Sequence, residues 1–181
     1  LPPALRSRLQ VTQQCRAEDI EAVRNRYASH DIPAELGTYF EDMASRLADA
    51  HLSIGRAGAS TIADLTAVGR PPILVPLPIA TDDHQAANTR EIVAAGGARS
   101  IRQDSFTAAE LAKQIQAMAQ HPETLANAAH RAWNCGHPHA ARDLADLVES
   151  LGGGAPLMDV IRLGGQASAS GQEALAMEKG E

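Results

Sequence analysis

The chain has 181 residues and a net charge of −6, and 44% of its residues are hydrophobic whereas only 3% are aromatic. This length permits one ordinary domain with a real core, together with a tail. The acidic balance argues against a nucleic-acid partner, which would favour a basic face. Arg, Asp, His or Pro interrupts every apolar run well before the ~20 residues that span a bilayer, so we expect no transmembrane helix.

The first residues favour a piece cut from a longer protein. The chain starts at Leu1 rather than Met, and no charged stretch followed by an apolar one marks a signal peptide. Cys15 and Cys135 lie far apart and form no metal-type pair, which fits a reducing, cytoplasmic setting. His137 and His139 are two residues apart, not the four of a helical zinc motif. We therefore expect neither a metal nor a cofactor.

Short β-like segments alternate with longer helical ones, which is the pattern of βαβ units around a parallel sheet. In chain order, the expected strands cover residues 9–13, 35–40, 51–54, 73–77 and 98–101. The expected helices cover residues 17–29, 42–48, 60–68 and 84–95, followed by helices that begin at Thr107, Pro122 and Pro138. A core rich in Ala, Leu, Val and Ile suits helices packed on such a sheet.

Local signals support several helices. Asp42 can cap the helix that follows it, and Gly69, with the prolines after it, closes the helix before it. The spacing of Ile20, Val23 and Tyr27 allows one face of the first long helix to be buried. Thr107 followed three residues later by Glu110 forms a capping-box pattern, which favours a helix start.

Two further segments differ from these in composition. Residues 73–77 form a continuous apolar run, as expected for a strand buried on both faces. Beyond Leu151 the composition turns to Gly and Ser, and we expect residues 152–181 to be a flexible tail.

The most informative segment is a strand, a glycine turn at Gly58 and a helix start, in that order. Glycine lets the backbone turn sharply and approach a ligand closely. The free N–H groups of Ala59, Ser60 and Thr61 would point out of the helix start, where the macrodipole favours an anion such as a diphosphate. The alternative is that Ser60 only caps the helix and Gly58 only makes the turn.

An acidic residue follows this turn at helical spacing. Asp64 lies three or four residues after Ser60 and Thr61, so it projects from the same face one turn further on. Its carboxylate can accept hydrogen bonds from the two hydroxyls of a ribose. An ordinary surface acid in a first helical turn is the alternative.

A second polar loop follows the next strand, so the two loops lie at the carboxyl ends of neighbouring strands, where open α/β sheets bind ligands. Gln85 and Asn88 are three residues apart and face the same way on the helix that starts there. Amides carry both donors and acceptors, which suits the hydroxyl and N-acetyl groups of a neutral sugar. Exposed polar residues at a helix start are the alternative.

Residues 56–65, 69–71, 74–78 and 83–88, in their order and spacing, resemble the C-terminal domain of the bacterial N-acetylglucosaminyltransferases of glycosyltransferase family 28. The resemblance covers about residues 1–151. It implies an α/β fold with a Rossmann-like parallel sheet and flanking helices, the C-terminal half of a GT-B enzyme. It further implies inverting transfer of N-acetylglucosamine (GlcNAc) from UDP-GlcNAc to the undecaprenyl-pyrophosphoryl-MurNAc-pentapeptide called lipid I, which forms lipid II in peptidoglycan synthesis.

The same resemblance assigns substrate-binding roles to eight positions. Ala59, Ser60 and Thr61 would hold the diphosphate, and Asp64 would hold the ribose. Gln85 and Asn88 would bind the GlcNAc, and His84 would contact the sugar or only cap its helix. Backbone groups near Phe40 would meet the uracil. No residue of this chain is expected to be the catalytic base.

Three departures from the family pattern qualify this assignment. The ribose-binding acid of the family is usually Glu, and Asp64 is one methylene shorter. Relatives often carry His where Ile79 stands. The glycine-rich loop and first strand of the domain, and the whole N-terminal domain, would precede Leu1.

The N-terminal domain of the family supplies the acceptor site for lipid I, the membrane-contacting patch and the base. We therefore expect a donor-binding domain over residues 1–151 that is inactive by itself. Its parent protein would lie peripherally on the cytoplasmic face of the bacterial inner membrane.

Two other interpretations stay open. Another GT-B enzyme that uses a UDP-sugar, such as a 2-epimerase or an antibiotic glycosyltransferase, would share these motifs. A 2-epimerase would need further carboxylates and histidines that we do not find. The second alternative is a binding module without activity.

Overall fold

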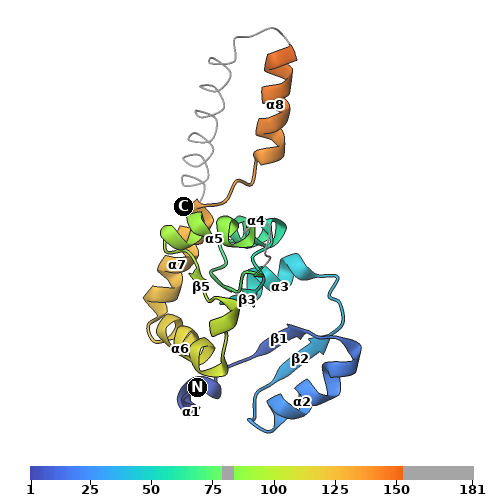
Figure 1. The fold of residues 1–181 in the computed structure, drawn as a ribbon, viewed down its shortest axis with the longest axis vertical. Helices are drawn as coiled ribbons and strands as arrows, with labels where there is room; N and C mark the ends of the chain where they lie inside the picture. The colour runs from blue at the N-terminus through green and yellow to red at the C-terminus, as the bar shows by residue number, and fades with distance from the viewer. Residues whose placement is uncertain (79–83, 153–181) are drawn as a thin grey trace, which may run out of the picture. The chain divides into compact units, whose positions relative to one another are not determined.

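The computed structural model describes residues 1–78 and 84–152 (Figure 1). Ile79, the side chain of His84 and the tail expected after Gly152 lie outside the described residues. The chain divides into two compact units, Leu1–Gly136 and His137–Glu181, and each is described by itself. None of the helices in the described ranges is long and apolar enough to cross a membrane.

The first unit opens with a two-stranded parallel sheet. Strands β1 (Val11–Gln14) and β2 (Ala34–Gly37) pair in register from Val11 opposite Ala34 to Gln14 opposite Gly37. The helical segments of this part are α1 (Pro3–Arg6), η1 (Ala17–Asp19, a 3-10 turn), α2 (Ile20–Ala28) and α3 (Met43–Asp49). Helix α2 connects the two strands and packs against β2, which completes one βαβ unit.

The second sheet is parallel, in the order β3 (Ser53–Gly55), β4 (Pro72–Leu74) and β5 (Arg99–Ser100). Helix α4 (Ala59–Ala67) connects β3 to β4, and α5 (His84–Ala94) connects β4 to β5. The short turn η2 (Gln103–Ser105) and helices α6 (Ala108–Ala119) and α7 (Pro122–Asn134) follow. In the second unit, the structure describes helix α8 (Ala140–Gly152). The predicted α/β class, with parallel strands and flanking helices, is confirmed.

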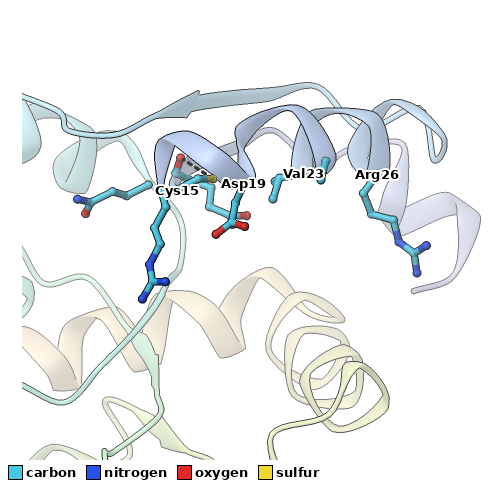
Figure 2. A pocket seen from close by; sticks show the side chains of 8 residues that line it. Cys15, Asp19, Val23 and Arg26 are labelled. Carbon is cyan, nitrogen blue, oxygen red and sulfur yellow. Dashed lines mark hydrogen bonds between the residues drawn. The ribbon is translucent and has the colours of Figure 1, made fainter.

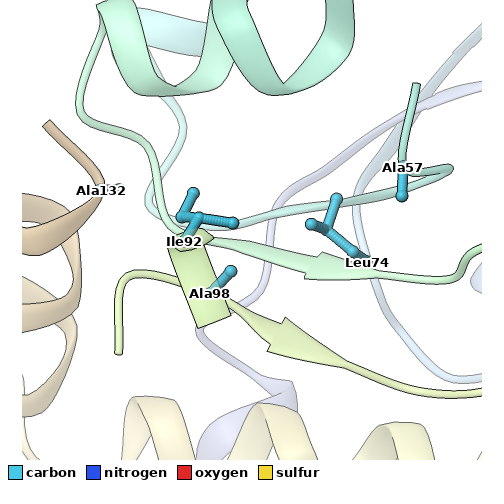
Figure 3. Packing of buried hydrophobic residues seen from close by; sticks show 5 residues of the cluster. All are labelled: Ala57, Leu74, Ile92, Ala98 and Ala132. Carbon is cyan, nitrogen blue, oxygen red and sulfur yellow. The ribbon is translucent and has the colours of Figure 1, made fainter. Parts of the chain in front are cut away.

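The central strand β4 explains how helices cover both faces of this sheet. Ile73 and Leu74 are adjacent and fully buried, so their side chains point to opposite faces. Leu74 packs in a cluster with Ala57, Ile92, Ala98 and Ala132, and Figure 3 labels these five residues. Ile73 packs in a second cluster with Ile101, Met118 and Ala128.

Small residues let helix α7 approach the sheet closely. A Cβ atom added to Gly97 would lie 2.6 Å from the backbone nitrogen of Ala132, so no side chain fits there. Ala132 is itself fully buried. Backbone packing therefore requires small residues at this contact between α7 and the segment before β5.

The predicted helix ends are confirmed in detail. Helix α4 ends at Ala67, and Gly69 follows it with a φ of +61°, the left-handed conformation of a C-terminal glycine. The N–H of Arg70 donates to the carbonyl of Leu65 at 2.7 Å, which completes the motif. At the start of α6, the hydroxyl of Thr107 accepts from the N–H of Glu110 at 3.1 Å, so the predicted helix start is confirmed. Only this half of the capping box forms, because the N–H of Thr107 donates to the Ser105 carbonyl instead of to Glu110.

All five strands are shorter than predicted, and two of them end three residues early. The strand expected over residues 73–77 ends at Leu74, because Pro76 has no N–H to donate to a neighbouring strand. The strand expected over residues 35–40 ends at Gly37.

Both sheets have unpaired edges. Within the described residues, β1 and β2 pair only with each other, and β3 and β5 pair only with β4, so the two outer edges of each sheet lack a partner strand. On β3, Ile54 is 45% exposed although it is a large apolar residue in a strand. An exposed apolar strand residue beside an unpaired edge marks an incomplete surface of this sheet.

Candidate functional site

The site predicted from the sequence lies where the strands of the second sheet end. Strands β3, β4 and β5 are parallel, so the loops that follow Gly55, Leu74 and Ser100 all leave the sheet at the carboxyl ends of its strands. Open α/β sheets bind ligands at this end. The predicted residues from Ala59 to Asn88 lie in the chain segments that follow β3 and β4.

The first turn of α4 presents free backbone donors. Gly58 is the N-cap residue, and no side chain caps the helix. The first N–H with an acceptor is that of Ile62, which donates to the Gly58 carbonyl at 3.0 Å. The N–H groups of Ala59, Ser60 and Thr61 have no acceptor within the described residues. The helix start can therefore receive an anion.

Gly58 and Ser60 act differently from what the sequence suggested. Gly58 has φ −66° and ψ 146°, a conformation open to any residue. A Cβ atom there would meet only the hydroxyl of Thr61, at 3.5 Å. Ser60 lies inside the helix rather than at its cap. The turn thus does not require glycine for its conformation, and the interpretation of Ser60 as a cap is wrong.

Asp64 lies one turn further along α4. Its side chain is exposed and has no hydrogen bond or ion pair with the described residues. The carboxylate is therefore available to a ligand bound at the helix start, and its ribose assignment stays a prediction.

The two predicted amides also hold the loops in place. The Oε1 atom of Gln85 accepts from the N–H of Leu77 at 2.9 Å, in the loop that follows β4. The Nδ2 atom of Asn88 donates to the carbonyl of Ala57 at 3.2 Å, in the loop that follows β3. The amide nitrogen of Gln85 and the amide oxygen of Asn88 have no partner among the described residues, so each amide retains one group for a sugar.

Arg56 connects the three loops, and its role was not predicted. Its Nη1 atom donates to the carbonyl of Val75 at 3.2 Å and to Oε1 of Gln103 at 2.8 Å. Arg56 opens the segment 56–65, whose resemblance to the family pattern pointed to this part of the chain. Nothing in the sequence singled out Gln103, because it lies 47 residues further along the chain.

Phe40 lies in the segment after β2. No hydrogen bond, ion pair or ring contact within the described residues connects it to the loops after β3 and β4. The Arg46 guanidinium carbon lies 4.3 Å from its ring centroid. Arg46 also pairs with Glu35 and Asp42, and these hydrogen bonds lower the pKa of both carboxyl groups. Asp42 is the N-cap residue of α3, as predicted, but its side chain makes no capping hydrogen bond and binds Arg46.

A cavity of about 520 Å³ lies at the end of β1 and the start of α2, and none of the predicted site residues lines it. Figure 2 shows Cys15, Asp19, Val23 and Arg26 along this segment. The thiol of Cys15 donates to the Gln13 carbonyl at 3.8 Å. The lining carries charges of both signs and no pattern that selects one class of ligand.

Comparisons with known proteins identify the family. The model of the glycosyltransferase family 28 C-terminal domain matches residues 2–149. A UDP-N-acetylglucosamine--N-acetylmuramyl-(pentapeptide) pyrophosphoryl-undecaprenol N-acetylglucosamine transferase of Novosphingobium aromaticivorans is 79% identical over 177 residues, which cover 97% of this chain and 45% of that protein. A protein of the same name from Erythrobacter litoralis is 72% identical over 180 residues, 99% of this chain and 45% of its own length.

A solved structure agrees with these matches. The crystal structure of Acinetobacter baumannii MurG has a TM-score of 0.71 and 30% sequence identity, and the match covers 82% of this chain and 46% of that one. The chain thus spans about half the length of the relatives that it matches. It belongs to glycosyltransferase family 28 and corresponds to the C-terminal domain of that family.

Proposed function

We propose that this chain is the donor-binding half of an enzyme that transfers GlcNAc from UDP-GlcNAc to lipid I and so forms lipid II. The observation that carries the proposal is the 79% identity, over 97% of this chain, to the N-acetylglucosamine transferase of Novosphingobium aromaticivorans. The free donors at the start of α4 and the amides of Gln85 and Asn88 support it, since their chemistry fits a diphosphate and a sugar.

In the proposed complex, the UDP diphosphate lies on the N–H groups of Ala59, Ser60 and Thr61. Asp64 accepts hydrogen bonds from the ribose. The amide nitrogen of Gln85 and the amide oxygen of Asn88 bind the GlcNAc.

The reaction displaces UDP from the sugar. The 4-hydroxyl of the acceptor's muramyl sugar attacks C1 of the GlcNAc, the bond from C1 to the diphosphate oxygen breaks, and its electron pair stays on UDP. The positive end of the α4 dipole stabilises the charge that grows on this leaving group. The base that takes the proton of the hydroxyl would come from the other half of the protein.

The open edges of β1 and β3 support the domain assignment. In the common Rossmann order 3-2-1-4-5-6, one strand lies between the strand that corresponds to β1 and the one that corresponds to β3. A first strand supplied by the parent protein would pair with both edges, and its following loop would reach the carboxyl edge of the sheet. We propose residues 1–151 as the rest of this domain.

We further propose that the parent protein binds lipid I through its N-terminal domain. Lipid I is anchored in the membrane by its undecaprenyl chain, so the enzyme would work peripherally at the cytoplasmic face of the inner membrane.

The direct test uses the full-length protein, purified and incubated with labelled UDP-GlcNAc and a lipid I analogue. We expect labelled lipid II and free UDP. Label transferred from a different UDP-sugar in preference to UDP-GlcNAc, or conversion of UDP-GlcNAc without an acceptor, would favour another GT-B activity and contradict the proposal. UDP-GlcNAc binding without turnover would favour a module that only binds.

A further inference from the structure

The loop between β2 and α3, residues 38–42, is held by one side chain that belongs to neither the loop nor the strand before it. Arg46 projects from the first half of α3 and contacts a residue before the loop, a residue within it and its last residue. We call this arrangement the Arg46 clamp, made of Arg46, Glu35, Phe40 and Asp42.

All three nitrogens of the Arg46 guanidinium are used in the clamp. Nη1 and Nη2 donate to the two carboxylate oxygens of Glu35, at 2.7 and 2.9 Å, in a bidentate pair. Nε donates to Oδ1 of Asp42 at 2.6 Å. Short, charge-assisted and bidentate hydrogen bonds are the most directional ones that a side chain makes. The two ends of the loop are thus fixed relative to each other.

The middle of the loop is fixed by the ring of Phe40. The guanidinium carbon of Arg46 lies 4.3 Å from the ring centroid, within the range of a cation–π interaction. The ring also lies close to the backbone of Gly37, where an added Cβ would be 3.1 Å from its Cε1 and Cζ atoms. A larger residue at position 37 would displace the ring.

We propose that Arg46 is a positioning residue for the nucleotide base of the donor. The inference rests on the proposed function, in which backbone groups near Phe40 meet the uracil. A loop that is ordered before the ligand arrives loses less conformational entropy on binding, so the clamp favours base recognition without contacting the base.

The clamp is expected to act on binding more than on global stability. The carboxylates of Glu35 and Asp42 are more than half exposed, and exposed ion pairs stabilise a fold only weakly. A role limited to folding would lower the affinity for every ligand alike, whereas a role in positioning this loop affects only ligands that carry the base.

The test compares Arg46→Ala with Arg46→Lys in the full-length protein, and with Arg24→Ala as a matched control. Arg24 is an exposed helix arginine whose ion pair, with Glu21 at 3.5 Å, lies within α2. The ligands are UDP and inorganic pyrophosphate, measured by calorimetry or by competition. We expect Arg46→Ala to weaken UDP binding about tenfold and to change pyrophosphate binding by less than about twofold.

The variants differ in what they restore. Lysine keeps the charge but offers a single ammonium group in place of a planar fork, so Arg46→Lys should recover only part of the loss. Arg24→Ala should bind UDP like the wild type. An equal loss for UDP and pyrophosphate, or no loss for UDP in Arg46→Ala, would overturn the inference.

Amide hydrogen exchange of the ligand-free protein tests the clamp separately from the proposed function. The amides of residues 38–42 should exchange faster in Arg46→Ala than in the wild type, while those of α4 should not change. Unchanged exchange in residues 38–42 would overturn the clamp even if UDP binds. Failure of the wild type to bind UDP would instead overturn the proposed function.

Discussion

The side-chain amide of Asn88 donates to the carbonyl oxygen of Ala57 at 3.2 Å and so connects α5 to the loop before α4. Ala57 is fully buried, and its side chain packs on Leu74 in the first core cluster. Gln85, one turn earlier on α5, accepts from the N–H of Leu77 in the neighbouring loop. Helix α5, which is proposed to bind the sugar, therefore also fixes the loop after β3 and the loop after β4 through these two hydrogen bonds.

Changing Asn88 to Ala should destabilise the domain. The change leaves the carbonyl of Ala57 without this donor, and an unsatisfied buried acceptor costs about 1–3 kcal/mol. Thermal unfolding of the variant should show the loss. The control is Asn127→Ala, an exposed helix position. An unfolding temperature equal to that of the wild type would show that the carbonyl finds another donor.

Arg56 and Gln103 should be energetically coupled. Their hydrogen bond of 2.8 Å joins loops 47 residues apart in the chain. We expect a double-mutant cycle of Arg56→Ala and Gln103→Ala to give a coupling free energy of about 1 kcal/mol in chemical unfolding. Additive effects of the two changes would contradict a direct interaction.

A methyl group at Gly97 should be costly, whereas one at Gly55 should not. The added Cβ at Gly97 would lie 2.6 Å from a backbone nitrogen of α7, so the helix or the strand must shift. Forcing extra atoms into a packed core costs about 1–3 kcal/mol. At Gly55 no atom lies within 4 Å of the added Cβ, which makes Gly55→Ala the matched control. Equal unfolding free energies for the two variants would contradict the packing described for α7.

The Arg46 clamp should weaken in acid. Arg46 lowers the pKa of the carboxyl groups of Glu35 and Asp42 from their ordinary values of 4.5 and 3.8. A carboxyl group whose pKa is lowered in the folded state stabilises the fold at pH values above its ordinary pKa. This stabilisation is lost as the pH falls through the lowered pKa.

Hydrogen exchange of residues 38–42, corrected for its intrinsic pH dependence, should therefore differ between wild type and Arg46→Ala by a constant factor from pH 7 to about pH 5. The difference should shrink only as the pH falls below the ordinary pKa values of the two carboxyl groups, and should disappear below their lowered pKa values. A difference that persists in stronger acid would mean that the ring contact with Phe40, rather than the ion pairs, holds the loop.

How far the sequence predicts this molecule depends on the range of each interaction. The helix start at Thr107 and the C-terminal glycine at Gly69 are local signals, and both were predicted correctly, although only half of the capping box forms. The strand after Ile73 was predicted too long, because its apolar run outweighed the missing N–H of Pro76.

The contacts that organise the site were not predicted, because they join residues that are far apart in the chain. Arg46 reaches Glu35 across 11 residues, and Arg56 reaches Gln103 across 47, so these pairs meet only when the sheets have formed. The spacing of Gln85 and Asn88 placed them on one face of a helix, but their backbone partners, Leu77 and Ala57, belong to two different loops.

The measurement that tests the donor site most directly is the affinity of the full-length protein for UDP-GlcNAc after Asp64 is changed. Asp64→Ala should weaken binding at least about 10- to 100-fold, because even one hydrogen bond to a charged group contributes about 1.5–3 kcal/mol. Asp64→Glu, which restores the length usual in the family, should bind at least as tightly as the wild type.

The control is Glu18→Ala, which removes an exposed acid that has no ion pair in the described ranges. It should leave the affinity for UDP-GlcNAc unchanged, and Asp64→Ala should leave the affinity for the lipid I analogue unchanged. Donor affinity in Asp64→Ala equal to that of the wild type would contradict the ribose assignment and, with it, the position proposed for UDP-GlcNAc on α4.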